Sequence, residues 1–190
     1  MKIIIFDTET TGLPLPNAAP LKKQPKIIEL GMVVLEDGKE THLNWMVYPG
    51  EEITAEITKI TGITNEDLAD KAPFSSIADT VVDIFTEADI AIAHNAPFDT
   101  KLVNFEFKRL GIEFSWPASV ICTVQEYTHR FGKRPKLTQL YESVMGEPLA
   151  QPHPAIDDAL ALATALKKDG FLKLLGYDHD DTTENQDGIH

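Results

Sequence analysis

The stretch that decides the fold lies at the start of the chain, where residues 2–10 read Lys-Ile-Ile-Ile-Phe-Asp-Thr-Glu-Thr. The continuous apolar run 3–6 is typical of a central strand that is buried on both faces. Side chains alternate along a strand, so Asp7 and Glu9 point to one face and Thr8 to the other. Two carboxylates on one face repel each other unless cations neutralise them. The stretch therefore predicts a buried strand that ends in a metal site.

Strands and helices alternate along the rest of the chain. After a Pro- and Gly-rich loop over 12–25, two strands are predicted at 27–35 and 41–47, in a hairpin around Glu36-Asp37-Gly38-Lys39. Apolar spacing predicts further strands at 90–93 and 120–122, and helices at 55–61, 74–85, 97–110, 124–130, 137–145 and 155–168. This order predicts an α/β fold, with a mixed sheet of an antiparallel hairpin plus parallel strands, flanked by helices.

The composition predicts one globular domain with a short tail. The 190 residues are 43% hydrophobic and 25% charged, enough to bury a core, and the single cysteine excludes an intrachain disulfide. We expect the domain over 1–177 and an acidic, disordered tail over 178–190, which holds no Lys or Arg. The apolar run before Asp7 is far shorter than a signal peptide or the roughly 20 residues that span a bilayer. We therefore expect a cytoplasmic protein with no membrane partner.

The charge is strongly acidic overall but unevenly distributed. The net charge of -13 is unusual for a nucleic-acid-binding protein. Residues 99–136, however, hold seven basic and four acidic side chains, a net of +3. This region could face an anionic polymer, and on charge alone it fits a solvated surface equally well.

A further acid follows a predicted strand in the segment 94–99, which reads His-Asn-Ala-Pro-Phe-Asp. Asp99 falls in the first turn of the predicted helix, where the helix dipole favours an acid, so it fits a helix start or a metal ligand. His94 and Asn95 are predicted at the C-terminal edge of the sheet, where open α/β sheets bind their ligands.

The segment 153–158, His-Pro-Ala-Ile-Asp-Asp, opens the last predicted helix. Helical spacing places Asp157 on the polar face and Asp158 at the border of the apolar face. A carboxylate at that border must be paired or must coordinate a cation, so Asp158 is the candidate functional acid. His153 can exchange protons near neutral pH beside the same cations, although a histidine before a helix is more often a surface residue.

Together these motifs resemble those of the DEDDh (DnaQ-like) 3′–5′ exonucleases. The matching segments are Phe-Asp-Thr-Glu-Thr-Thr-Gly-Leu at 6–13, His-Asn-Ala-Pro-Phe-Asp at 94–99 and His-x-Ala-x-x-Asp at 153–158. Shorter segments at 27–31 and 60–68 are also similar to the family, which includes proofreading subunits of bacterial DNA polymerases and free-standing relatives. The resemblance covers about residues 2–170, and the long Pro-rich segment 13–25 departs from it.

The resemblance implies a ribonuclease-H-like fold and hydrolysis of DNA 3′ ends, single-stranded or frayed, to nucleoside 5′-monophosphates. It implies two divalent cations, Mg²⁺ with Mn²⁺ able to substitute, held by Asp7, Glu9, Asp99 and Asp158, with His153 as general base. Contacts to the last nucleotides are expected from Thr8, Thr11, Leu13, Ile60, His94 and Asn95. Leu13 and Ile60 would pack against the terminal base, with ordinary loop packing as the alternative. A DNA polymerase acting in trans is a candidate partner.

Three other functions fit parts of the pattern. A haloacid-dehalogenase-type phosphatase also has an acid pair after a buried strand, but it normally has Asp where Glu9 stands. A non-catalytic nucleic-acid-binding module would be expected to have lost one of the four acids or His153, and all are present. A 3′–5′ exoribonuclease that trims RNA or short oligonucleotides is the main alternative, because tolerance of a 2′-hydroxyl is not readable from these motifs.

Overall fold

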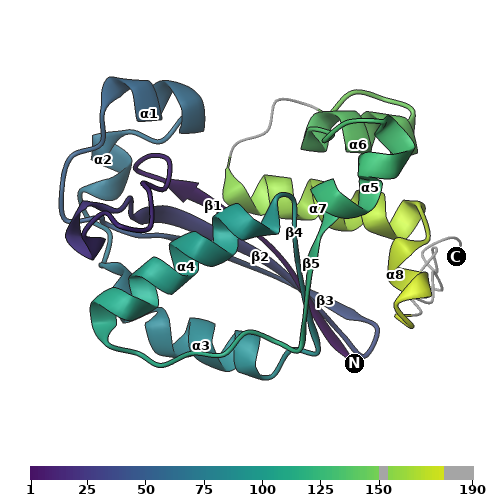
Figure 1. Cartoon of the computed structure of the whole chain (residues 1–190), viewed down its shortest axis with the longest axis horizontal. Helices are drawn as coiled ribbons and strands as arrows, with labels where there is room; N and C mark the ends of the chain where they lie inside the picture. The colour runs from purple at the N-terminus through teal and green to yellow at the C-terminus, as the bar shows by residue number, and fades with distance from the viewer. Residues whose placement is uncertain (150–153, 178–190) are drawn as a thin grey trace, which may run out of the picture.

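The computed structural model describes residues 1–149 and 154–177, and its centre is a five-stranded mixed sheet (Figure 1). The strands are β1 (Lys2–Thr10), β2 (Ile27–Glu36), β3 (Lys39–Met46), β4 (Ile90–Ala93) and β5 (Ser119–Cys122), in the order β3-β2-β1-β4-β5. β1 pairs antiparallel with β2 and parallel with β4. On the outer sides, β3 pairs antiparallel with β2, and β5 pairs parallel with β4. The predicted hairpin and parallel strands are confirmed.

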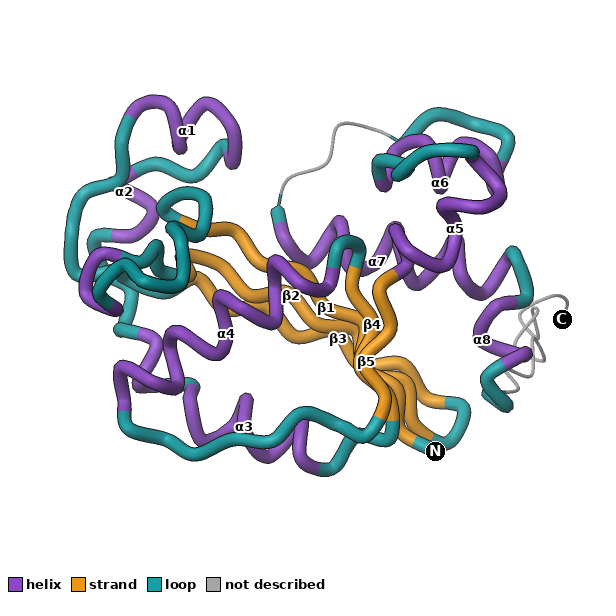
Figure 2. The backbone as a smooth tube through the Cα atoms, in the orientation of Figure 1, coloured by secondary structure: helices purple, strands orange, loops and turns teal. Residues whose placement is uncertain are grey.

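Helices cover both faces of the sheet (Figure 2). They are α1 (Ala55–Thr61), α2 (Asn65–Leu68), α3 (Ala78–Thr86), α4 (Ala96–Leu110), α5 (Thr123–Phe131), α6 (Leu137–Met145), α7 (Ala155–Lys168) and α8 (Phe171–Leu174). Short 3₁₀ turns form at Leu21–Lys23 and Phe74–Ser76. None of the helices in the described ranges is long and apolar enough to cross a bilayer.

The alternation of β1 side chains divides the core into two layers. Ile4 and Phe6 pack with α3 and α4 on one face, whereas Ile3 and Ile5 pack with α5, α6, α7 and α8 on the other. All four isoleucine and phenylalanine side chains are fully buried, as expected for a central strand covered on both faces. The odd-numbered acids of β1 therefore face α7, and the even-numbered Thr8 faces α4.

β1 runs from Lys2 to Thr10 and pairs with β2 along its whole length, so Asp7 and Glu9 lie within the strand, as their alternation requires. Two local predictions needed correction. The helix predicted over 74–85 is a 3₁₀ turn followed by α3, with the break at Ile77, whose N–H closes the turn onto the Phe74 carbonyl. α4 begins one residue before Pro97. The four-residue helices α2 and α8 had not been predicted, since four residues carry no readable period.

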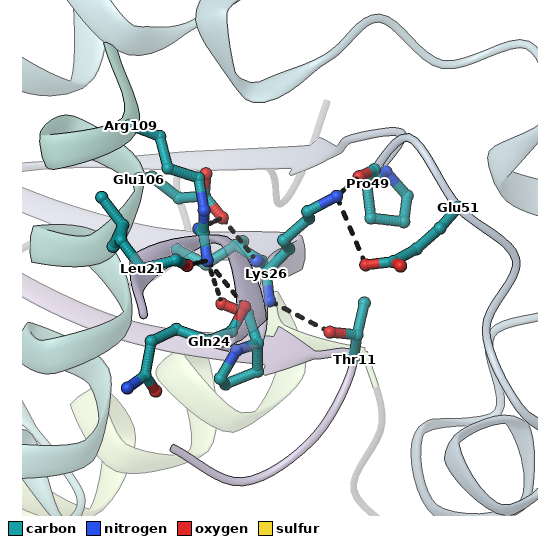
Figure 3. Close-up of polar contacts among 10 residues, drawn as sticks. Thr11, Leu21, Gln24, Lys26, Pro49, Glu51, Glu106 and Arg109 are labelled. Atoms are coloured by element: carbon teal, nitrogen blue, oxygen red, sulfur yellow. Dashed lines mark hydrogen bonds and ion pairs between the residues drawn. The ribbon is translucent and has the colours of Figure 1, made fainter. Parts of the chain in front are cut away.

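The Pro-rich segment 13–25 is anchored to α4 by hydrogen bonds from Arg109 to its backbone (Figure 3). Arg109 Nη2 donates to three backbone carbonyl oxygens, at 3.4, 2.8 and 2.8 Å, which are those of Leu21, Gln24 and Pro25. The Arg109 guanidinium also pairs with Glu106 at 2.8 Å, and Glu106 accepts the backbone N–H of Ile27 at 3.0 Å. One planar guanidinium thus holds the segment in place from the side of the helix.

Candidate active site

Three carboxylates meet beyond the buried part of β1. Asp7 and Glu9 of β1 and Asp158 of α7 each offer an oxygen, and these oxygens lie within 4.8 Å of one another. The strand supplies its two acids from alternate positions on the α7 face, and the helix supplies the third from its first turn. Asp157, the next residue back, is exposed, whereas Asp158 is only partly so. The helix placement predicted from the sequence is confirmed at these two residues.

Asp99 reaches the same end of the sheet from the opposite face. It lies in the first turn of α4, is 2% exposed, and its Oδ1 accepts a 2.7 Å hydrogen bond from the Thr8 hydroxyl. Thr8 is therefore engaged with Asp99 inside the protein, although it was predicted to contact substrate. Asp99 is not one of the three acids whose oxygens lie within 4.8 Å, but its charge acts on Asp7.

Sequence reasoning did not single out Glu29 of β2, which lies directly across from Glu9 in the antiparallel pair. Its carboxylate is 1% exposed and accepts from the Asn44 side chain at 2.8 Å and the Ala155 backbone N–H at 2.9 Å. The signal that could have found it is a single acid inside the apolar run 27–35.

When no cation is bound, the four carboxyl groups of the predicted metal site keep their protons to a higher pH than ordinary acids do. Burial, reinforced by the charges of neighbouring acids, raises the pKa of Asp7 well above its ordinary value and that of Glu9 to about 8. Burial and the nearby Asp157 raise the pKa of Asp158 to about 6. Burial raises the pKa of Asp99 to about 7, against the opposing effect of the Thr8 hydrogen bond.

These residues suit divalent cations of the Mg²⁺ type. Carboxylate oxygens are the ligands that such hard cations prefer, and like-charged acids this close need positive charge between them. Within the part of the chain that the structure describes, Asp158 Oδ1 is buried and has no hydrogen-bond partner. A buried oxygen without a hydrogen-bond partner, close to two other carboxylates, is suited to coordinate a cation.

We expect the metal-free protein to lose stability as the pH rises from about 5 to about 8. In the folded state the pKa of Glu9 is about 8 and that of Asp158 is about 6. Both residues therefore keep protons that the unfolded chain loses above about pH 4. Their protonation thus stabilises the fold at low pH, and this contribution disappears as the pH passes the folded-state values. Mg²⁺ should replace the protons and raise the melting temperature more at pH 8 than at pH 6.

Differential scanning fluorimetry over this pH range, with and without Mg²⁺, measures both effects. The Glu9→Gln variant is the control, and it should flatten both the pH dependence and the response to Mg²⁺. A wild-type melting temperature that rises steadily from pH 5 to pH 8 without metal would contradict the electrostatic description.

His94 and Asn95, both predicted to contact substrate, have partners within the protein. The His94 ring nitrogens lie 3.0 Å from the Thr123 hydroxyl and 3.1 Å from the Pro135 carbonyl oxygen. Asn95 adopts a left-handed conformation, φ 76°, and its Oδ1 accepts from Arg134 at 2.8 Å. Burial lowers the pKa of His94, which favours the neutral ring. His94 thus ties the β4–α4 turn to the loop before α6, and its role toward substrate stays a prediction.

The two apolar residues predicted to pack on a terminal base are exposed. Leu13 is 79% exposed and Ile60, on α1, is 54% exposed. Thr11, between β1 and Leu13, accepts the backbone N–H of Lys26 at 3.0 Å, which holds the chain as it leaves β1 (Figure 3). Leu13 and Ile60 are therefore not packed into the core, and their contact with a terminal base stays a prediction.

Two other predictions lie outside the described residues. His153, the predicted general base, precedes the first described residue of α7 by two positions, and the acidic tail 178–190 follows the last described residue.

Several known proteins are similar to this chain in sequence. A sequence model of the exonuclease family RNase_T matches residues 4–166. The chain is 36% identical to DNA polymerase III subunit epsilon of Pasteurella multocida over 125 residues, 65% of this chain and 47% of that protein. It is 32% identical to the same subunit of Rickettsia prowazekii over 170 residues, 86% of this chain and 71% of that protein. The chain thus spans about half the length of the first relative.

Two solved structures share the fold over nearly the whole chain. Exonuclease X in complex with 5′ overhanging duplex DNA aligns with a TM-score of 0.64 and 23% identity, covering 94% of this chain and 95% of that one. The nuclease domain of 3′hExo, a DEDDh family member bound to rAMP, aligns with a TM-score of 0.70 and 18% identity, covering 90% and 92%. The predicted ribonuclease-H-like fold is confirmed.

Proposed function

Because this chain belongs to the exonuclease family RNase_T, whose DEDDh members carry its motifs, we propose that it removes nucleotides one at a time from the 3′ ends of DNA. The observation that carries the proposal is the cluster of Asp7, Glu9 and Asp158, with Asp99 beside it, at the edge of the sheet beyond β1. Four acids from three separate parts of the chain form a site for cations and, through them, for phosphate.

In the proposed reaction, water attacks the last phosphodiester phosphorus and the bond from phosphorus to the 3′ oxygen of the preceding nucleotide breaks. The terminal nucleotide leaves as a 5′-monophosphate, and the released 3′ oxygen takes up a proton. Two divalent cations, when bound, would supply activation of the water and stabilisation of the leaving oxygen. Asp7, Glu9, Asp99 and Asp158 would hold them, and His153 would accept the proton from the attacking water.

The preferred substrate in this proposal is an unpaired 3′ end, and two exposed apolar side chains support the unpaired state. Leu13 and Ile60 offer apolar surface on which a terminal base can stack once it is unpaired, which favours single-stranded or frayed ends. The epsilon relatives are named as subunits of a DNA polymerase, and this supports DNA as substrate and a polymerase in trans as partner. A cytoplasmic location and Mg²⁺ as the metal in the cell belong to the same proposal.

Digestion of matched DNA and RNA oligonucleotides tests the function. Substrates labelled at the 5′ end, single-stranded and double-stranded, are incubated with Mg²⁺ or Mn²⁺, and the products are separated by length and mass. We expect a ladder that shortens by one nucleotide at a time, release of nucleoside 5′-monophosphates, and no reaction in the presence of a chelator. The Asp7→Asn variant serves as the inactive control.

Each other outcome points to a different function. Activity that survives chelation, or release of inorganic phosphate, would contradict the two-metal exonuclease. Faster digestion of RNA than of the matched DNA would favour the exoribonuclease alternative. Metal-dependent binding without cleavage would indicate a nucleic-acid-binding module.

A further inference from the structure

The first turn of α7 lies directly on β2, at a point where β2 has no side chain. A Cβ atom added at Gly31 would lie 2.3 Å from the backbone nitrogen of Ile156 and 2.5 Å from the carbonyl carbon of Ala155. Such distances are far below any real contact, so only glycine permits this approach of helix to strand. In the antiparallel register Gly31 lies opposite Asp7. The helix thus begins immediately above the strand position that faces the first acid of the cluster.

Glu29, two residues earlier on the same face of β2, holds the same turn by a hydrogen bond. Its Oε2 accepts the backbone N–H of Ala155, the first residue of α7, at 2.9 Å. This N–H is one of the donors that a helix leaves unpaired at its N-terminus, where a carboxylate is favourable. The other oxygen accepts from Asn44 on β3 at 2.8 Å, which fixes the carboxylate in turn.

The pairing of β1 with β2 places Glu29 and Gly31 beside the acids of β1. Glu29 pairs with Glu9, and Gly31 pairs with Asp7. The two residues that contact the start of α7 therefore lie next to the two acids, on the same face of the sheet. Asp158 lies one turn into the helix, three residues after Ala155. A shift of the first turn of about 1 Å would therefore move Asp158 away from the other two carboxylates.

We propose that Glu29 and Gly31 are positioning residues, which set the first turn of α7 so that Asp158 meets Asp7 and Glu9. This role rests on the proposed function, because it gives the three carboxylates the spacing that cations require. Glu29 acts through the backbone of Ala155 and not as a ligand, whereas Gly31 acts by leaving space for that backbone.

A comparison of Glu29→Ala with Glu29→Gln separates the effect of the position of the α7 first turn from the effect of the negative charge of Glu29. Alanine removes both the acceptor and the negative charge. Glutamine removes the charge but keeps an oxygen that can accept the Ala155 N–H, while the Asn44 amide can rotate to present its own oxygen. Gly31→Ala forces the helix off the strand without changing any charge.

The control is Asp169→Ala, at the other end of α7. Asp169 accepts from the Tyr127 hydroxyl at 2.7 Å and pairs with Arg130 at 2.6 Å, so its loss loosens the end of the helix that is remote from the acids. The control shows the effect of a general weakening of α7. For all four variants and the wild type, we would measure Mn²⁺ affinity by calorimetry, the digestion rate at saturating DNA, and the melting temperature.

We expect Glu29→Ala and Gly31→Ala to lose about 10- to 100-fold in Mn²⁺ affinity and in rate, the usual effect of removing a residue that orients metal ligands. Glu29→Gln should recover most of that loss, and Asp169→Ala should lower only the melting temperature. Equal losses in Glu29→Gln and Glu29→Ala would show that the charge matters and not the position, and would overturn the proposal. Wild-type affinity in Glu29→Ala would overturn it as well.

The same measurements separate this inference from the proposed function. A wild-type protein that does not digest DNA or RNA contradicts the proposed function, whatever the variants do. A wild-type protein that digests normally, beside a Glu29→Ala variant that does the same, contradicts the positioning role alone. If Gly31→Ala fails to fold, the comparison of the two Glu29 variants still decides.

Discussion

The Asp158→Ala variant should lose essentially all turnover, whereas Asp157→Ala should keep most of it. The two acids are adjacent in the first turn of α7, but only Asp158 contributes an oxygen to the cluster with Asp7 and Glu9. Asp157 is exposed and contributes a charge that raises the pKa of Asp158. Removing a metal ligand should lower the turnover rate by more than the roughly 10- to 100-fold that follows removal of a residue that only orients the ligands.

Single-turnover rates with saturating Mg²⁺ measure this difference, and circular dichroism checks that both variants are folded. Because the two substitutions are chemically identical and one residue apart, each is the matched control for the other. Equal losses of rate in the two variants would contradict the placement of the cations at Asp158.

The His153→Ala variant should bind metal normally and still turn over about 10²–10⁴-fold more slowly, the usual cost of removing a general acid or base. The four carboxylates that would hold the cations remain, so DNA should bind in the presence of metal. In the wild type the rate should rise with pH as the imidazole loses its proton, and this rise should flatten in the variant.

Calorimetric titration with Mn²⁺, beside single-turnover rates from about pH 5.5 to pH 8.5, tests this prediction. His129→Ala provides the control, because His129 is an exposed histidine on α5 and should be replaceable without effect. A fall in metal affinity that matches the fall in rate would make His153 a ligand instead of a base.

Much of the fold could be predicted from local patterns, because each pattern was strong by itself. The apolar run of β1, the Asp37-Gly38 turn and the alternation of helices with strands were sufficient for the sheet and its two covered faces. The break at Ile77 could not be predicted, because a continuous apolar spacing does not distinguish a 3₁₀ turn from the start of an α-helix.

The acids of the candidate site could be predicted from the sequence, but the residues that hold the surrounding elements in place could not. Period-2 and period-3.6 spacing correctly oriented Asp7, Glu9 and Asp158. The contacts of Glu29 with Ala155, and of Arg109 with the Pro-rich segment, join residues more than 80 positions apart. Such pairs depend on how layers stack in three dimensions, and no local period records them.

The three-acid cluster joins β1 to α7, two elements far apart in the sequence, and this has a consequence for synthesis. Asp158 leaves the ribosome roughly 8–30 s after Asp7 at translation rates of about 5–20 residues per second. Until α7 docks on β1 and β2, a nascent chain holds only part of the acid cluster. A chain that stops before α7 lacks one of the three acids, so the cluster cannot be complete until α7 has been synthesised.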